Sequence, residues 1–287
     1  MSAPLPVIPV GFFGCGVVGS GTLQALQQNQ HAIQEQLGAR LEVRRVCVRD
    51  EKRQRGVTLS PGVLTTDPAA ILDDPEIRIV VEVMGGLEPA GEYLGKALRA
   101  GKHCVTANKE LLAKSGAELL REAEARRLDL FFEGSVAGGI PILRALQVSL
   151  AGNQVTELFG IVNGTTNYIL TQMAQTGKSF ETALAEAQAQ GYAEADPTDD
   201  VDGYDAVYKL AILAGIAFRT RIPPERIARQ GIREVAAQDI EYARELGYTI
   251  KLLAVAREAE EGLELRVEPA LIPNAHPLAS VSDAYNA

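Results

Sequence analysis

The sequence places a carboxylate and an ammonium group four residues apart, at Asp205 and Lys209. If Gly203 opens a helix, both side chains lie on one face and point toward the same space. A lysine beside a carboxylate can donate a proton to an oxygen that gains negative charge, and a well-placed general acid accelerates such a step by roughly a hundred- to ten-thousandfold. An exposed ion pair, contributing only about 0.3 to 0.5 kcal/mol, is the simpler alternative.

An acidic stretch precedes this pair. Between residues 186 and 205 the chain has no basic residue and seven carboxylates: Glu186, Glu194, Asp196, Asp199, Asp200, Asp202 and Asp205. Like charges destabilise a folded loop unless a cation, an ammonium group or a helix N-terminus offsets them. A calcium-binding loop can be aligned here, but Lys209 then occupies the position of the bidentate glutamate, which disfavours calcium. Anchors for a substrate ammonium group and a solvated acidic loop both remain open.

Three glycines form a G-x-G-x-x-G turn near the N-terminus. An apolar run over 7–14 precedes the turn, and helix-forming residues follow it over 17–36. Between a strand and a helix, such glycines allow pyrophosphate to approach the backbone N–H groups. This context favours a dinucleotide site over a purely structural turn, with cofactor contacts at Gly14, Gly16, Val17, Val18 and Gly19.

Basic residues gather at the end of the next predicted strand. Residues 40 to 55 contain seven arginines and lysines against three acids, and Arg49 closes the strand. An arginine at this position can pair with an adenosine 2′-phosphate, so NADP is favoured over NAD. Asp50 could instead hold a ribose hydroxyl, and a solvated basic loop is a further alternative.

The elements that must position these residues alternate between strand and helix patterns. We predict strands over 7–14, 41–48, 78–83, 103–106 and 128–132, and helices over 17–36, 89–100 and 109–126. Such alternation predicts an α/β fold with a Rossmann-like, doubly wound parallel sheet. Pro9 lacks the N–H that a central strand needs, so we expect it at the beginning of its strand.

The pattern changes after Phe132. A glycine-rich turn is followed by a predicted helix over 141–150, a strand over 156–162, several helices, and strands over 249–256 and 263–271. We therefore predict two domains, a dinucleotide-binding domain over 1–132 and a second α/β domain with its own sheet over 133–287.

Composition excludes several classes of protein. No stretch of the 287 residues is apolar enough to span a membrane, and no secretory leader is visible, so we expect a cytoplasmic protein. The net charge of −9 lies entirely after residue 132, which argues against nucleic acid or an anionic membrane as partner. Cys15, Cys47 and Cys104 lack the spacing of a zinc site or a disulfide framework.

The sequence resembles homoserine dehydrogenase along nearly its whole length. The resemblance lies in six motifs in order: the 14–19 turn, Met84-Gly85-Gly86, Val105-Thr106-Ala107-Asn108-Lys109, the segment 133–141, Asn163-Gly164-Thr165-Thr166-Asn167-Tyr168, and the segment 191–209. This family interconverts aspartate β-semialdehyde and L-homoserine with NAD or NADP, on the route to threonine and methionine. The resemblance implies this activity, an amino-acid substrate, and a homodimer formed through a second domain that binds substrate.

The resemblance also implies roles for residues. Lys209 is similar to the acid/base lysine, with Asp205 beside it and Lys109 as the second lysine of the site. The implied substrate contacts are Tyr192, Glu194, Gly164, Thr165, Asp200, Asp205 and Lys109, and further cofactor contacts are Gly85, Thr106, Asn108 and Lys109. A helix start at Lys109 and a helix cap at 163–168 are the simpler interpretations.

The turn after Phe132 resembles the family's monovalent-cation loop. The implied sodium ligands are the Glu133 carboxylate and the carbonyls of Val136, Gly138 and Ile140. Gly134 departs from the alanine expected there, and a plain glycine turn is an equally good interpretation.

The end of the chain departs from the family pattern, and two alternative functions are considered. The family's chain normally continues past Tyr285 through a glycine-rich return to the cofactor domain, so we expect this chain to lack that return and any regulatory domain. A phosphorylating aldehyde dehydrogenase needs a nucleophilic cysteine, and none of the three cysteines has a suitable setting. A catalytically incomplete protein that only binds cofactor is the remaining alternative.

Overall fold

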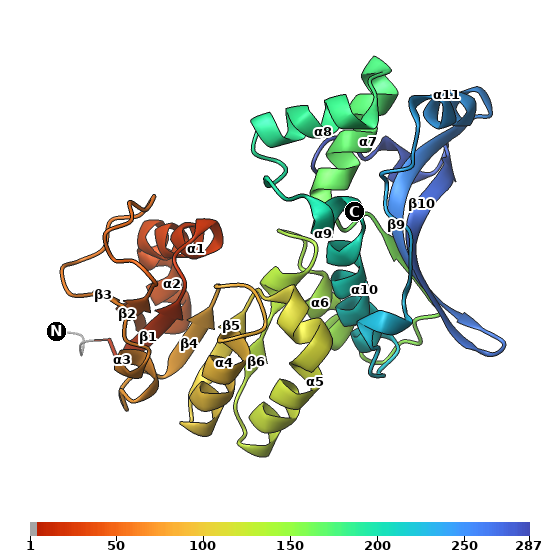
Figure 1. Cartoon of the computed structure of the whole chain (residues 1–287). Coiled ribbons are helices and arrows are strands. Elements are labelled where there is room, and N and C mark those ends of the chain that lie inside the picture. The colour runs from red at the N-terminus through yellow and green to blue at the C-terminus, as the bar shows by residue number, and fades with distance from the viewer. Residues whose placement is uncertain (1–4) are drawn as a thin grey trace. The chain divides into compact units, whose positions relative to one another are not determined.

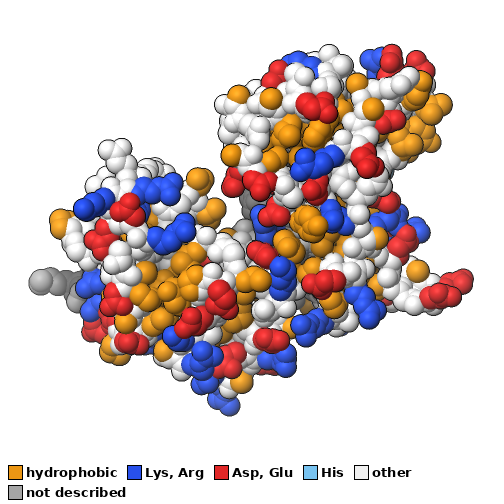
Figure 2. All heavy atoms as spheres, in the orientation of Figure 1, with side chains coloured by type: hydrophobic (Ala, Val, Ile, Leu, Met, Phe, Trp, Pro, Cys, Tyr) orange, Lys and Arg blue, Asp and Glu red, His pale blue; other side chains and the backbone are white. Residues whose placement is uncertain are grey.

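A computed structural model describes residues 5–287 of the chain (Figure 1). The chain divides into two compact units, the first ending at Phe132 and the second spanning Glu133–Ala287. None of the helices within residues 5–287 is long and apolar enough to cross a bilayer. Charged side chains of both signs are spread over the face shown in Figure 2.

The first unit is built on a six-stranded sheet in which every strand pair is parallel. Its strands are β1 (Val7–Phe13), β2 (Arg40–Cys47), β3 (Leu64–Thr65), β4 (Ile79–Glu82), β5 (His103–Thr106) and β6 (Leu130–Phe131). The order β3-β2-β1-β4-β5-β6 is that of a doubly wound dinucleotide-binding fold, which confirms the predicted fold class.

Five helices connect these strands: α1 (Val17–Gln28), α2 (Gln30–Leu37), α3 (Ala69–Leu72), α4 (Ala90–Arg99) and α5 (Lys109–Ala125). Phe12 and Phe13 are fully buried on β1, and Leu94 and Leu98 on α4, because a parallel sheet is covered by helices on both faces. The helix predicted over 17–36 is wrong as one element, since it breaks at Asn29.

Pro9 lies at the third residue of β1, not at its beginning. The ladder between β1 and β4 starts only at Val10, so the missing N–H of Pro9 costs no hydrogen bond on that side. The Pro9 carbonyl is still used, because it accepts a hydrogen bond from the Arg78 N–H (3.0 Å).

The second unit contains a separate four-stranded mixed sheet in the order β7-β9-β10-β8. Its strands are β7 (Glu157–Gly160), β8 (Ala228–Arg229), β9 (Tyr248–Ala259) and β10 (Gly262–Pro273). Its longer helices are α7 (Gly164–Thr176), α8 (Phe180–Ala189), α10 (Tyr204–Ala217) and α11 (Ala237–Glu245). Its short elements are η1 (Glu133–Ser135), α6 (Ile142–Arg144), η2 (Ala145–Ser149), α9 (Thr198–Val201), η3 (Pro224–Arg226) and η4 (Pro277–Ser280). The helix predicted over 141–150 is therefore one short α-helical turn continued as a π-helix.

Strand β9 is buried without interruption from Lys251 to Ala256. Successive side chains of a strand point to opposite faces, so both faces of β9 are covered. Leu253 and Val255 pack on one face with Ile161 and Val281. Lys251 is two residues before Leu253 and therefore points to the same face of β9, which places an ammonium group on a buried face.

Candidate functional site

The glycine turn of the first unit has the geometry of an anion-binding loop. Gly14 has φ +99°, and a Cβ there would lie 2.7 Å from the Val83 carbonyl oxygen. A Cβ on Gly19 would lie 2.7 Å from the Gly14 carbonyl oxygen, so both positions require glycine. A Cβ on Gly16 would meet nothing within 4 Å. Gly16 is the N-cap of α1 and has no side-chain hydrogen bond, which leaves the helix N-terminus open to a phosphate.

A cavity of about 610 Å³ adjoins this turn. Among the predicted cofactor residues, Gly14, Gly16, Arg49 and Gly85 line it. Val17, Val18 and Gly19 belong to the first turns of α1 but are not among its lining residues, and the Val17 side chain is 93% exposed.

Arginines form one wall of this cavity. Arg49, Arg53 and Arg55 line it, and the Arg55 guanidinium also donates to the Asp50 and Arg53 carbonyls of its own loop. The Asp50 carboxylate accepts a hydrogen bond from the Lys52 N–H (2.8 Å). Three arginines therefore line a cavity large enough for part of a dinucleotide, and its residues fit a phosphorylated cofactor.

Thr106 and Asn108 do not line the cavity; they hold its rim together. The buried Glu82 carboxylate accepts hydrogen bonds from the Thr106 hydroxyl (2.6 Å) and the Met84 N–H (2.8 Å). Asn108 donates to the Gly86 carbonyl (2.6 Å) and caps α5 by accepting from the Leu111 N–H. This network fixes the carboxyl ends of β4 and β5. Glu82 was not among the predicted site residues, although a carboxylate within the apolar strand Ile79–Glu82 was a visible signal.

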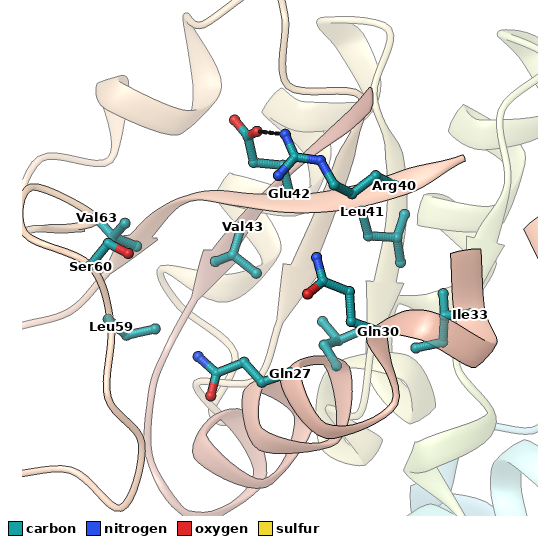
Figure 3. A pocket seen from close by; sticks show the side chains of 11 residues that line it. Gln27, Gln30, Ile33, Arg40, Leu41, Glu42, Val43, Leu59, Ser60 and Val63 are labelled. Carbon is teal, nitrogen blue, oxygen red and sulfur yellow. Dashed lines mark hydrogen bonds and ion pairs between the residues drawn. The ribbon is translucent and has the colours of Figure 1, made fainter. Parts of the chain in front are cut away.

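A smaller hollow of about 230 Å³ lies beside α1, α2 and β2 (Figure 3). At its rim Arg40 and Glu42 pair with each other (2.7 Å), and the Gln27 amide donates to the Thr58 carbonyl. None of the predicted site residues lines this hollow, so the larger cavity is the candidate dinucleotide site.

In the second unit, Asp205 and Lys209 form a buried ion pair. Gly203 adopts φ +86° as the N-cap of α10, which confirms that it opens a helix. The Lys209 Nζ donates to the Asp205 Oδ2 (2.7 Å) and to the Val162 carbonyl (2.8 Å). The side chains are 2% exposed for Asp205 and 15% for Lys209, so the alternative of an exposed ion pair is wrong.

Asn163 connects this pair to the acidic stretch. Its amide nitrogen donates to Asp200 Oδ1 (2.7 Å) and to Asp205 Oδ2 (2.8 Å). Its amide oxygen accepts from the Thr166 N–H and so caps α7. One buried amide therefore brings two of the predicted carboxylates beside Lys209. Asn163 was predicted as part of a family motif and, more simply, as a helix cap, but not as the link to Asp200 and Asp205, because an amide that joins residues about forty positions apart leaves no pattern in spacing.

Apart from Lys109, the other predicted substrate residues lie on α7 and on the loop before α9. The Thr165 hydroxyl donates to the Tyr192 carbonyl (2.8 Å), and the Tyr168 and Tyr192 rings pack with centroids 4.7 Å apart. The Glu194 residue is exposed and its backbone carbonyl accepts from the Gln188 amide (3.0 Å). The loop thus carries an accessible carboxylate on a backbone that two side chains hold in place.

Arginines offset part of the acidic charge. Arg233 forms an ion pair with Asp202, and the Arg229 guanidinium, 3.7 Å from the Tyr204 ring centroid, donates to the Asp202 carbonyl. Hydrogen bonds from Thr198 keep the pKa of Asp196 below its usual value. Pairing therefore stabilises part of the acidic stretch, whereas Glu194, Asp196 and Asp199 are exposed, so both alternatives for the stretch remain open.

Lys109 is the first residue of α5, in the first unit, directly after the Asn108 cap. This agrees with its simpler interpretation as a helix start and leaves its proposed role open.

The implied cation ligands are partly occupied by the protein itself. Both oxygens of the Glu133 carboxylate accept backbone N–H groups, from Leu143 and Arg144 (2.9 Å each). The Ile140 carbonyl accepts from the Ile142 N–H (2.8 Å). Residues 5–287 hold no cluster of three or more His, Cys, Asp or Glu side chains suited to a metal ion. The donor set fits a helix cap more completely than a cation site.

Two family models together match most of the chain. A family model described as "Homoserine dehydrogenase" matches residues 141–287, and one described as "Homoserine dehydrogenase, NAD binding domain" matches residues 14–133. The homoserine dehydrogenase of Synechocystis is 49% identical over 97% of the chain, which spans 65% of that protein.

Solved structures give the same result. The crystal structure of a homoserine dehydrogenase from Thiobacillus denitrificans superposes with a TM-score of 0.93 at 48% identity, covering 98% of this chain and 65% of that one. A hyperthermophilic archaeal homoserine dehydrogenase in complex with NADPH superposes with a TM-score of 0.81 at 28% identity, covering 98% of this chain and 86% of that one. The chain thus spans about 65% of the length of the curated relatives it matches. By both family models and these likenesses, the chain belongs to the homoserine dehydrogenase family.

Proposed function

We propose that this chain acts as an NAD(P)-dependent homoserine dehydrogenase, interconverting L-aspartate β-semialdehyde and L-homoserine. The observation that carries the proposal is the buried Asp205–Lys209 pair, which Asn163 ties to Asp200 within a family match over the same residues. In the synthetic direction the product would feed threonine and methionine biosynthesis.

The chemistry needs one hydride and one proton. When bound, the nicotinamide supplies the hydride to the aldehyde carbon of the semialdehyde. The carbonyl oxygen then takes the electron pair of the C=O π bond, and Lys209 donates the proton that makes it a hydroxyl group. Asp205 and the Val162 carbonyl take two of the three ammonium N–H groups, which leaves one for the substrate oxygen.

The substrate is an amino acid, so its ammonium and carboxylate groups also need partners. We assign the ammonium group to Glu194 and Asp200, because carboxylates form charge-assisted hydrogen bonds with it. Gly164, Thr165 and Tyr192 would form the wall beside it. By family likeness alone, Lys109 is assigned to the substrate carboxylate or its carbonyl oxygen.

For the cofactor we propose a preference for NADP. The Arg49 and Arg53 side chains line the cavity and could pair with a 2′-phosphate. Asp50 could serve the ribose hydroxyl of NAD, so use of both cofactors is compatible with this site. A sodium site at the turn after Phe132 rests on family likeness only, because the Glu133 carboxylate and the Ile140 carbonyl already accept backbone N–H groups.

A homodimer is also proposed. Apolar side chains are exposed on the strands of the second sheet, including Phe159 on β7 (42%) and Leu271 on β10 (56%). Pairing with a second copy would cover them. Light scattering that showed only monomer at micromolar concentration would exclude this dimer.

The proposed activity is tested by NAD(P)H-linked turnover of homoserine, with both cofactors, on this chain and on a chain extended to the length of its relatives. Turnover in either protein supports the proposal. If both bind NADPH but neither turns over homoserine, the alternative of a catalytically incomplete binding protein is correct. Covalent acyl labelling of Cys15, Cys47 or Cys104 would favour the aldehyde dehydrogenase alternative.

A further inference from the structure

A second buried lysine lies in the second unit, outside the pair described above. Lys251 on β9 is 3% exposed. Its Nζ donates to the Asn167 amide oxygen (2.9 Å) and to the Val281 carbonyl (2.5 Å). Burial lowers its pKa from 10.5 to about 8, although Asp283 partly opposes this shift. A lysine held in apolar surroundings at this cost needs a structural or functional reason.

Asn167 links this ammonium group to the segment 281–287. Its side chain is 1% exposed and makes three hydrogen bonds. The oxygen accepts from Lys251, and the nitrogen donates to the carbonyls of Val281 (3.3 Å) and Tyr285 (3.2 Å). Lys251 and Asn167 together therefore fasten the segment 281–287 at two of its carbonyls.

The fastened segment packs against the start of α7. Ala287 exchanges two backbone hydrogen bonds with Ile161 (2.7 and 3.0 Å). A Cβ on Gly164 would lie 2.6 Å from the Ala284 carbonyl oxygen, and one on Gly160 would lie 2.7 Å from that of Ala287. The backbone of the segment is therefore packed so closely against residues 160–164 that no side chain fits between them at Gly160 or Gly164.

Residues 160–164 in turn carry the groups that hold the Asp205–Lys209 pair. The Val162 carbonyl accepts from Lys209, and the Asn163 amide donates to Asp205. We propose that Lys251 is a positioning residue for the active site: through Asn167 it holds the segment 281–287 against residues 160–164 and so fixes the position of Val162 and Asn163. This proposal rests on the proposed function.

Lys251→Met tests the proposal, because methionine keeps the apolar stem and removes the ammonium group. Lys102→Met is the matched control. Lys102 is also 3% exposed and also donates to two backbone carbonyls, those of Asp74 and Ile77, but it belongs to the first unit and immediately precedes β5. The extended enzyme is used for activity, with wild type measured alongside.

Two readouts separate positioning from general destabilisation. Hydrogen exchange should show amide protection at Ile161 and in the first turn of α7 falling at least about tenfold in Lys251→Met and staying unchanged in Lys102→Met. The kcat for homoserine should fall about ten- to a hundredfold in Lys251→Met only, with the NADPH dissociation constant unchanged, because a proton donor displaced by about 1 Å loses rate by a factor of this size.

Unchanged protection, or lost protection with an unchanged kcat, would overturn the proposal. If Lys251→Met does not fold, Asn167→Asp replaces it: this variant keeps the acceptor for Lys251 but loses the donor to the segment, and the same two changes are expected. A wild-type enzyme without turnover would refute the proposed function, and the catalytic part of this inference with it. The exchange data alone would still decide whether Lys251 fastens the segment.

Discussion

The coupling energy between Asp205 and Lys209 should be several times that of an exposed pair of the same spacing. The paired atoms lie 2.7 Å apart, and the side chains are 2% and 15% exposed, so water screens the attraction little. We expect a double-mutant cycle with Asp205→Asn and Lys209→Met to give a coupling energy of about 1 to 3 kcal/mol. Asparagine at this position keeps an acceptor for Asn163 and leaves no cavity.

The chain contains a matched control pair. Glu92 and Lys96 on α4 have the same spacing and order, with Nζ and Oε1 2.6 Å apart, but their side chains are 50% and 51% exposed. The cycle with Glu92→Gln and Lys96→Met should give only about 0.3 to 0.5 kcal/mol. This smaller coupling should decrease further as salt is added.

Urea unfolding followed by far-UV circular dichroism measures both cycles, because the chain has no tryptophan to report by fluorescence. The chain has two compact units, so each cycle is taken from the transition that its own variants shift. Measurements at about 0.05 and 0.5 M salt separate screened from buried charges. A coupling for Asp205–Lys209 no larger than the control, and equally reduced by salt, would refute the reasoning.

Three further predictions concern the cofactor turn and the buried lysine. Arg49→Ala should raise the dissociation constant for NADPH about ten- to a hundredfold and leave the dissociation constant for NADH unchanged, as measured by titration. The control variant Arg40→Ala, at the other end of β2, should change neither dissociation constant. Gly14→Ala should lower the free energy of unfolding by about 1 to 3 kcal/mol because φ is +99° there. Gly16→Ala should keep the wild-type free energy of unfolding but bind the cofactor more weakly. Equal effects of the two substitutions on stability and on cofactor affinity would contradict these assignments. Between pH 8 and 10.5 Lys251 binds more protons in the unfolded chain than in the folded one, so wild type should gain up to about 3 kcal/mol of stability relative to Lys251→Met as the pH rises. Urea titrations at each pH measure the free energy of unfolding of both proteins. A difference between the two proteins that does not change with pH would exclude the lowered pKa.

Local sequence patterns predicted the fold class of the first unit. The strand, glycine turn and helix at its start depend on residues adjacent in sequence, and Gly14 and Gly19 occupy the positions that the motif requires. The alternation of strands and helices likewise determined a parallel sheet. Elements of two to four residues such as β3 and α3 were missed, because so short a segment has no measurable periodicity.

The candidate site was only partly predictable. Asp205 and Lys209 are four residues apart on one helix, so their pairing follows from helix geometry. The burial of this pair does not follow from helix geometry, because Asn163, Val162 and Asp200 reach the pair from elsewhere in the chain. Such long-range hydrogen bonds leave no spacing that a sequence can show.

Lys251 illustrates the same limit more sharply. In sequence it is one lysine at the start of an apolar strand, where an exposed strand end is the simplest interpretation. The structure buries it because strand alternation places it beside Leu253 and Val255, under the segment that contains Val281.

The most direct test of the account is the kcat/KM for homoserine of Lys209→Met and wild type in the extended enzyme, with the NADPH dissociation constant measured for both. The account predicts that Lys209→Met loses roughly a hundred- to ten-thousandfold in kcat/KM while NADPH binding stays within about twofold of wild type. Near-normal turnover in Lys209→Met would contradict the central claim, because the proton would then come from another group.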